Sequence, residues 1–220
     1  MSILFKIKKI STAVLEFLLP LNDAEKAFKK LSLEEFVSRA KTSAPVNIKD
    51  AKTLFSYQDK IVKSAIHLLK YKKDDGAAKL LGQAMANVAE EWLNDLQTFE
   101  NFKNPVLIPV PMSKEHLVER GENHTEKLCL HLLNFLPKDL AKVDTQSLKK
   151  AHDTKSQVKT ASRSERLKNL SGSFEANEKI CGKNILLIDD VITTGATIEE
   201  CRKTLYEKGA RRVMALAIAH

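Results

Sequence analysis

Residues 184–197, Asn-Ile-Leu-Leu-Ile-Asp-Asp-Val-Ile-Thr-Thr-Gly-Ala-Thr, decide the fold of this chain. The first five form a continuous apolar run typical of a buried strand. A helix is expected from Thr197 to Lys208, ended by Gly209, and a second apolar strand follows over residues 212–218. A strand, a helix and a strand joined by short turns predict a parallel, right-handed βαβ unit. The fold class is therefore α/β.

The turn between this strand and this helix carries polar residues suited to a phosphorylated ligand. Ligands of open α/β sheets bind beyond the carboxyl ends of the strands, where this turn lies. Backbone N–H groups at a helix N-terminus favour a phosphate, and Gly195 lets the backbone approach an oxyanion. Asp189 and Asp190 would repel that phosphate, so they suit neutral hydroxyl groups or a bridging metal ion. A sugar with a phosphate and a diol satisfies both halves; the alternative is an ordinary turn with a capping Thr.

Length and charge narrow the class of protein without deciding the ligand. The 220 residues correspond to one domain, or one domain with an appendage, when a domain has about 150 residues. A hydrophobic share of 43% supplies a full core, which argues against a disordered chain and against a disulfide-rich scaffold. The net charge of +8 suits either a nucleic acid or a small polyphosphate.

Most of the excess positive charge lies in residues 149–168. This segment is polar, has no sustained apolar period and is expected to be a loop. It contains two acidic residues, Asp153 and Glu165, and seven basic ones: Lys149, Lys150, Lys155, Lys159, Arg163, Arg166 and Lys168. The segment has no aromatic residue on which a base could stack, so a polyphosphate ligand is favoured over nucleic acid.

Apolar periodicity places the remaining elements. It predicts short helices over residues 1–50 with a capping box at Ser32, helices from Gln58, over about 77–96 and over 124–135, and a strand within 105–110. A loop is expected between that strand and the helix that starts at His124.

Cysteine, histidine and membrane signals are weak. The three cysteines are widely spaced without a C-x-x-C pair, and the six histidines show no ligand spacing, so no metal site is assigned. Each histidine is expected to face solvent or to make a structural hydrogen bond. The apolar residues 13–21 contain Glu16 and Pro20 and fall short of the roughly 20 residues that a membrane span requires. We therefore expect no membrane span and a cytoplasmic protein.

Four segments carry a resemblance to a known family. Residues 186–197 resemble the motif of type I phosphoribosyltransferases that binds 5-phosphoribosyl-1-pyrophosphate (PRPP). Residues 108–112 and 120–123 resemble the "PVP" and "RGFNQ" elements of the ComF (competence protein F) family, and Leu69-Lys-Tyr71 matches its early "KY" element. Residues 154–174 resemble its T-x-x-Q…R…N stretch. The similarity covers roughly residues 55–219.

The resemblance implies a type I phosphoribosyltransferase fold with a central, mostly parallel sheet flanked by helices. Residues 1–50 would form a helical N-terminal extension and residues 51–220 the phosphoribosyltransferase domain. The implied reaction is a Mg²⁺-dependent pentosyl transfer, in which a nitrogen acceptor receives the phosphoribosyl group of PRPP and pyrophosphate leaves.

The resemblance also assigns roles to residues. Asp189 and Asp190 would hold the ribose hydroxyls, with Mg²⁺ bridged through PRPP near them. Arg163 and Arg166 would act in catalysis from a mobile basic lid over residues 149–166. The PRPP-binding set would continue through Val191, Ile192, Thr193, Thr194, Gly195, Ala196 and Thr197. The pyrophosphate loop would comprise Pro111, Met112, Ser113 and Lys114, with Arg120.

Two departures from the family leave alternatives open. Thr193 stands where the purine-salvage branch usually has an acid, so a 6-oxopurine acceptor is disfavoured. The zinc-binding cysteines usual after a "LLFP" element are absent from residues 21–47, so no zinc is assigned. The acceptor would be set by a hood from the N-terminal half. Two alternatives to an enzyme stay open: a non-enzymatic accessory role in DNA uptake, and a regulator that binds PRPP. The oligomeric state also stays open, and the sequence is compatible with a dimer.

Overall fold

The computed structural model describes residues 21–151 and 172–220, and a five-stranded parallel sheet forms its centre. The strand order is β1-β7-β6-β2-β3, and every pairing is parallel. The strands are β1 (Ala51–Phe55), β2 (Val106–Pro109), β3 (Lys142–Val143), β6 (Asn184–Val191) and β7 (Arg212–Ala219). In register, Ile188 of the central strand β6 lies between Pro109 and Leu216.

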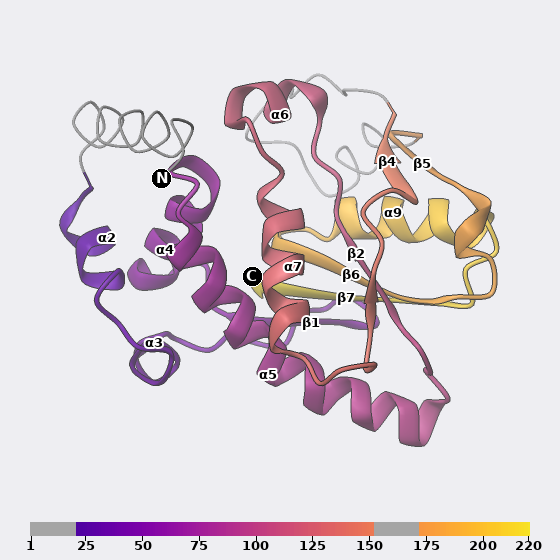
Figure 1. Ribbon diagram of the computed structural model, residues 1–220, viewed down its shortest axis with the longest axis horizontal. Coiled ribbons are helices and arrows are strands. Elements are labelled where there is room, and N and C mark those ends of the chain that lie inside the picture. Colours follow the sequence, from indigo (N-terminus) through magenta and orange to yellow (C-terminus); the bar gives the residue numbers. More distant parts are fainter. Residues whose placement is uncertain (1–20, 152–171) are drawn as a thin grey trace, which may run out of the picture.

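Helices cover both faces of this sheet (Figure 1). Leu186 and Ile188 pack in the same apolar cluster as α4 (Lys60–Tyr71), α5 (Asp75–Glu100) and α7 (His124–Phe135). Ile185 and Leu187, which point the opposite way, pack with α9 (Ala196–Glu207). Burial on both faces explains why β6 is an uninterrupted apolar run rather than an alternating one.

The connections from the central strands define where a ligand would bind. The chain leaves β2 through α6 (Lys114–Arg120) and α7 toward β3 on one side. From β6 it continues through α9 to β7, which lies on the other side of β6 in the strand order. The helix α9 packs on the opposite face of the sheet from α7. The point between β2 and β6 is therefore a topological switch point, beyond which ligands of open α/β sheets bind.

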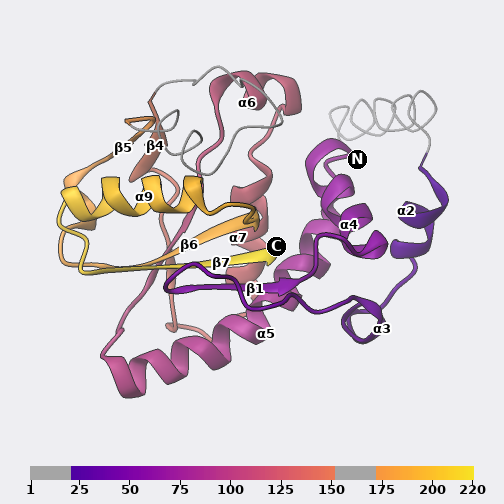
Figure 2. The same ribbon diagram turned by 180° about the vertical axis from the view of Figure 1, so that it is seen from behind.

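The N-terminal helices α2 (Asp23–Phe28) and α3 (Leu33–Arg39) gather beside α4 (Figure 2). Both begin with a capping box, and the one expected at Ser32 is confirmed. Phe28 and Phe36 meet edge to face at 5.5 Å, which joins the two helices to the core. In the described ranges, no helix has both the length and the apolar character to cross a membrane.

A small antiparallel pair stands apart from the main sheet. It consists of β4 (Leu148–Lys150) and β5 (Phe174–Ala176), followed by the short η1 (Glu178–Ile180). Figure 2 shows it on the side away from α2 and α3. Lys149 and Lys150 lie in β4, so the expectation of a loop from residue 149 is wrong at its start. Arg163 and Arg166 lie outside the described residues.

The predicted βαβ unit is confirmed, with shifted boundaries. β6 continues through both acids to Val191, and α9 begins one residue before Thr197. The helix expected over 77–96 runs over Asp75–Glu100. The expected loop after β2 contains α6, which the sequence analysis missed, as it missed β1.

Candidate functional site

The turn from β6 into α9 presents backbone groups at the switch point. Gly195 occupies the N-cap of α9 with φ 79°, and no side chain caps this helix. A Cβ at Gly195 would lie 2.5 Å from Cδ1 of Ile48, so the backbone and the 48–50 connector approach closely. The first N–H groups of a helix have no intrahelical acceptor. The turn therefore offers donors and a partial positive charge to an anion.

The two acids at the end of β6 have different surroundings, because successive strand residues point to opposite faces. Asp190 points toward α4 and α7 and is 4% exposed. Its Oδ2 atom lies 2.7 Å from Nζ of Lys70 and 2.9 Å from Nε2 of His124. Asp189 is half-buried, and its Oδ1 accepts the Asp190 N–H at 2.8 Å. One oxygen of Asp189 is thus left for another partner at the strand end.

These surroundings separate the acidities of the two carboxyl groups. Burial together with the negative charge of Asp190 raises the pKa of Asp189 to about 8. Burial alone would raise the pKa of Asp190 too, but the Lys70 charge and the His124 contact outweigh it and hold that pKa below its usual range. Burial lowers the pKa of Lys70, yet attraction to Asp190 leaves it raised overall. At neutral pH Asp190 is ionised, and Asp189 is largely protonated.

His124 is fixed in one tautomer by Arg120. Nη1 of Arg120 lies 3.3 Å from Nδ1 of His124. A guanidinium can only donate, so Nδ1 is the acceptor and the proton of the neutral ring is on Nε2, facing Asp190. The Arg120 guanidinium also lies 5.1 Å from the centre of the Tyr71 ring, a cation–π contact. Four side chains from α4, α6, α7 and β6 thus converge through direct contacts.

The segment Arg120-Gly-Glu-Asn123 has a local reason for its residue types. Gly121 ends α6 with φ 71°, a conformation that favours glycine. Asn123 caps α7 by accepting the N–H groups of Thr125 and Glu126. His124 is therefore the first residue of α7, at a position set by the cap.

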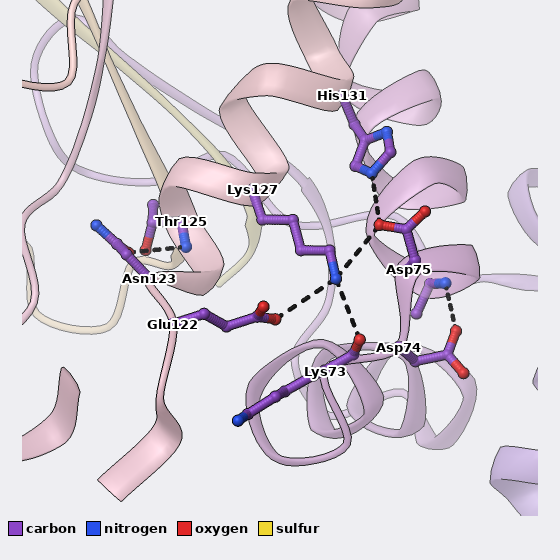
Figure 3. Close-up of polar contacts among 9 residues, drawn as sticks. Lys73, Asp74, Asp75, Glu122, Asn123, Thr125, Lys127 and His131 are labelled. Atoms are coloured by element: carbon purple, nitrogen blue, oxygen red, sulfur yellow. Dashed lines mark hydrogen bonds and ion pairs between the residues drawn. The ribbon is translucent and has the colours of Figure 1, made fainter. Parts of the chain in front are cut away.

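A cluster around Lys127 braces the two helices that carry Lys70 and His124 (Figure 3). Nζ of Lys127 lies 3.3 Å from Asp75, 3.4 Å from Glu122 and 3.1 Å from the carbonyl oxygen of Lys73. His131 contacts Asp75 at the outer edge of this cluster. The cluster joins the start of α7 to the α4–α5 turn, and so fixes the spacing of the cations beside Asp190.

The expected pyrophosphate loop lies beside the acids. The N–H of Val110 donates to the Ile188 carbonyl at 2.9 Å, which holds the start of the loop against β6. Pro111 and Met112 are half-buried, and Ser113 is buried and caps α6. Lys114 is the exposed first residue of α6, whereas Arg120 at its end reaches His124.

The sequence analysis missed the role of His124. It named Lys70 and Tyr71 only as part of a segment that resembles the ComF family and gave them no role in the site. The expectation that each histidine faces solvent or makes a structural bond gave His124 no place in the site. One signal was available in the sequence. Three of the segments that resemble the ComF family or the phosphoribosyltransferase motif contain Lys70, Arg120 and Asp190, respectively. The contacts of Lys70 and of His124 with Asp190 span 120 and 66 residues of chain, so no local pattern could reveal them.

The difference between the two acids leads to a prediction on pH. The pKa of Asp189 is higher in the folded chain than its ordinary value of 3.8, so folding favours its protonated form. The contribution of Asp189 to stability is present below about pH 4 and is lost as the pH rises toward 8. We expect Asp189→Asn to remove part of the loss of stability between pH 5 and pH 8.5. Urea unfolding midpoints at both pH values, without ligand, measure this; parallel losses in the variant and the unsubstituted chain would contradict it.

Comparison with known proteins places this architecture in a family. Residues 79–220 match the phosphoribosyl transferase domain, so the chain belongs to the phosphoribosyl transferase domain family. It is similar to the competence protein ComFC of Bacillus subtilis, at 37% identity over 109 residues, covering 49% of this chain and 40% of that protein. The ComFC of Streptococcus pneumoniae is 33% identical over 122 residues, covering 56% of this chain and 51% of that protein.

A third relative is named for DNA utilization. The DNA utilization protein YhgH of Escherichia coli O157:H7 is 29% identical over 107 residues, covering 49% of this chain and 45% of that protein. The chain spans about half the length of the curated relatives it matches. These matches confirm the resemblance to ComF-type phosphoribosyltransferases.

Comparison with solved structures finds weaker similarities. An allosteric regulatory enzyme of purine biosynthesis aligns with 69% of this chain and 29% of its own, at 16% identity and a TM-score of 0.43. The hypoxanthine-guanine phosphoribosyl transferase of L. donovani aligns with 64% of this chain and 67% of its own, at 16% identity and a TM-score of 0.38. With the family match and the parallel sheet flanked by helices, the expected fold class is confirmed.

Proposed function

We propose that this chain binds PRPP together with Mg²⁺ at the β6–α9 turn and transfers the phosphoribosyl group to a nitrogen acceptor, releasing pyrophosphate. The observation that carries the proposal is the uncapped start of α9 directly after two acids at the switch point between β2 and β6. One half of this turn suits a phosphate, and the other half suits a diol.

The 5-phosphate would lie over the residues from Thr193 to Thr197. The turn contains three threonine hydroxyls, and the Ala196 N–H at the start of α9 makes only a long hydrogen bond of 3.5 Å to one of them, that of Thr194. Gly195 gives the backbone its left-handed conformation and is buried against Ile48. Hydrogen bonds from backbone N–H groups to a charged oxygen are among the stronger ones in proteins.

The ribose diol would lie at the acids. Lys70 and His124 contact Oδ2 of Asp190 at 2.7 Å and 2.9 Å and so orient this carboxylate. One ribose hydroxyl would donate to Asp190 and the other to the free oxygen of Asp189. The ionised Asp190 would also stabilise positive charge that develops on the sugar ring as the bond to pyrophosphate breaks.

The leaving pyrophosphate needs positive charge beside it. Arg120 is half-buried, and among the described residues its Nε–H has no hydrogen-bond partner. A guanidinium matches phosphate oxygens geometrically. Arg120 and the Pro111–Ser113 backbone would therefore bind pyrophosphate, while Arg163 and Arg166 stay predictions for the same task.

The residues fit a Mg²⁺ ion that is held mainly by the substrate. In the part of the chain that the structure describes, no three His, Cys, Asp or Glu side chains could together hold a metal. Magnesium is commonly bound by one or two carboxylates plus substrate phosphates, and Asp189 has an oxygen to offer once the ion has displaced its proton. When bound, the ion would neutralise charge on the leaving pyrophosphate.

Calorimetry with PRPP tests the proposal. We expect binding of PRPP at submillimolar concentration in the presence of Mg²⁺, and weaker binding of ribose 5-phosphate, which lacks the pyrophosphate. Thr197→Val removes one hydroxyl at the phosphate end and should weaken both ligands similarly. No binding of PRPP at millimolar concentration would refute the proposal.

A second candidate is an accessory role in DNA uptake without catalysis. It is supported by the names of two relatives, a competence protein and a DNA utilization protein, and by the net charge of +8. This role predicts affinity for single-stranded DNA that falls steeply with salt. A third reading, a PRPP-binding regulator, predicts binding of PRPP without pyrophosphate release when nitrogen bases are added.

A further inference from the structure

A cavity of about 350 Å³ lies along the outer face of α4. Its lining includes three rings and an ammonium group, from Tyr57, His67, Tyr71 and Lys70. The remaining lining residues are Asn22, Lys63, Ser64 and Ile66. Three aromatic or heteroaromatic rings in one cavity suit a planar ligand.

This cavity adjoins the proposed PRPP site. Lys70 lines it and also contacts Asp190. His67 and Lys70 are three residues apart on α4 and so share a face of the helix. On the other side, the Tyr57 N–H donates to the His220 carbonyl, and Nδ1 of His220 donates to the Ile192 carbonyl at 2.8 Å. The cavity thus reaches the same edge of the sheet as the β6–α9 turn.

His67 is held in this cavity by a buried carboxylate. Nδ1 of His67 lies 2.6 Å from Oε1 of Glu25, whose side chain is only 2% exposed. The other carboxylate oxygen of Glu25 accepts the Asn22 N–H at 2.8 Å, which fixes the orientation of the group. A carboxylate has no proton to give, so Nδ1 of neutral His67 carries the hydrogen and Nε2 keeps a free lone pair. A base oriented by a third group in this way is suited to accept a proton.

The proposed reaction needs a base that the β6–α9 turn does not contain. Residues from Thr193 to Thr197 have no group that titrates near neutral pH. Both ring nitrogens of His124 are engaged, one by Asp190 and one by Arg120. Asp190 is held by Lys70, and Asp189 is assigned to the ribose diol and Mg²⁺. The base must therefore come from another element at this edge.

We infer that His67, oriented by Glu25, is the general base for an acceptor bound in the α4 cavity. This inference rests on the proposed function. As the acceptor nitrogen forms its bond to the anomeric carbon, the bond from that carbon to pyrophosphate breaks and its electron pair leaves with pyrophosphate. The proton of the acceptor N–H passes to Nε2 of His67, so atoms and charges balance.

The inference specifies the class of acceptor. It is a planar nitrogen heterocycle or aromatic amide that carries an N–H, stacks against the ring of Tyr57 or Tyr71 and points its N–H at the edge of the His67 ring. Among the described residues, the lining has two ammonium groups, from Lys63 and Lys70, and no carboxylate, while Glu25 behind it is paired with His67. An acceptor with an oxo or carboxylate substituent therefore fits better than a cationic one.

The test measures pyrophosphate release from PRPP and Mg²⁺ with uracil, orotate, adenine and hypoxanthine, which carry an N–H, and with nicotinate, whose ring nitrogen has no proton to lose. We expect release with at least one N–H acceptor. His67→Gln should reduce that rate by about 100-fold or more, a typical effect of losing a general base. Glu25→Gln should reduce it less. PRPP affinity, measured by calorimetry, should change by less than about twofold in both variants.

Controls separate the base from a structural role. His116→Gln removes another histidine paired with a carboxylate, here Glu119 at 3.1 Å, and should leave the rate unchanged. In His67→Gly, added imidazole should restore part of the rate, which a purely structural role would not allow. Loss of activity in His220→Gln but not in His67→Gln would overturn the inference. So would release with none of the N–H acceptors by a chain that still binds PRPP, whereas failure to bind PRPP refutes the proposed function itself.

Discussion

Asp190→Asn is expected to lower the free energy of unfolding by about 3 kcal/mol, because it leaves the positive charge of Lys70 without its partner. The side chains of Lys70 and Asp190 are 19% and 5% exposed, so water cannot replace the lost contact. The same substitution should weaken PRPP binding by about tenfold or more through the lost charge beside the sugar. From the sequence alone, the two acids appear only as ligand-binding groups with no part in folding.

Urea unfolding at neutral pH measures this effect on stability. Asp189→Asn is the matched control, since Asp189 pairs with no cation among the described residues and should cost much less. Lys70→Met in the Asp190→Asn background should recover part of the stability, because it removes the unpaired charge. Equal unfolding midpoints for Asp190→Asn and Asp189→Asn would contradict the role that we assign to the Lys70 contact.

Gly195→Ala is expected to reduce PRPP affinity by more than about tenfold and to destabilise the chain by about 2 kcal/mol. A non-glycine residue at φ 79° is strained by about 1 to 2 kcal/mol. The added Cβ would also lie 2.5 Å from Cδ1 of Ile48, so the turn or the connector must shift. A shift of the turn moves the N–H groups that would hold the phosphate.

Gly182→Ala provides a control with the same backbone strain. Gly182 has φ 69°, and nothing lies within 4 Å of a Cβ added there. We expect similar or slightly smaller destabilisation and unchanged PRPP affinity. Calorimetry and urea unfolding on both variants give the comparison; equal PRPP affinity of the two would show that the β6–α9 turn does not hold the phosphate.

The C-terminal half of the fold could be predicted because its signals are local. The apolar run of β6, the glycine after α9 and the apolar run of β7 define three consecutive elements with short joints. β1 was missed because Ala51–Phe55 is an edge strand whose burial alternates irregularly. α6 was missed because none of its seven residues is buried, so it has no apolar stripe.

The candidate site could be predicted only in part, for a different reason. The β6–α9 turn is a continuous motif, so its residues could be named from the sequence. The residues that hold Asp190 in place are Lys70 and His124, together with Arg120, which contacts His124. The second example is the pair of His67 and Glu25, which joins two helices through residues 42 positions apart. Such contacts depend on how distant elements pack together, and they cannot be inferred from a single sequence.

The antiparallel pair of β4 and β5 has a consequence for how this protein can diversify. The Ala151 N–H donates to the Ser173 carbonyl at 2.9 Å, and the Gly172 N–H donates to Glu200 at 2.7 Å. Residues 151 and 172 are therefore held next to each other and to α9, whatever number of residues joins them. Between two points that are fixed in this way, each doubling of the number of connecting residues costs only about 0.6 kcal/mol of closure entropy. Insertions and deletions at this point can accumulate during evolution without disturbing the sheet, and so can fit one scaffold to different partners.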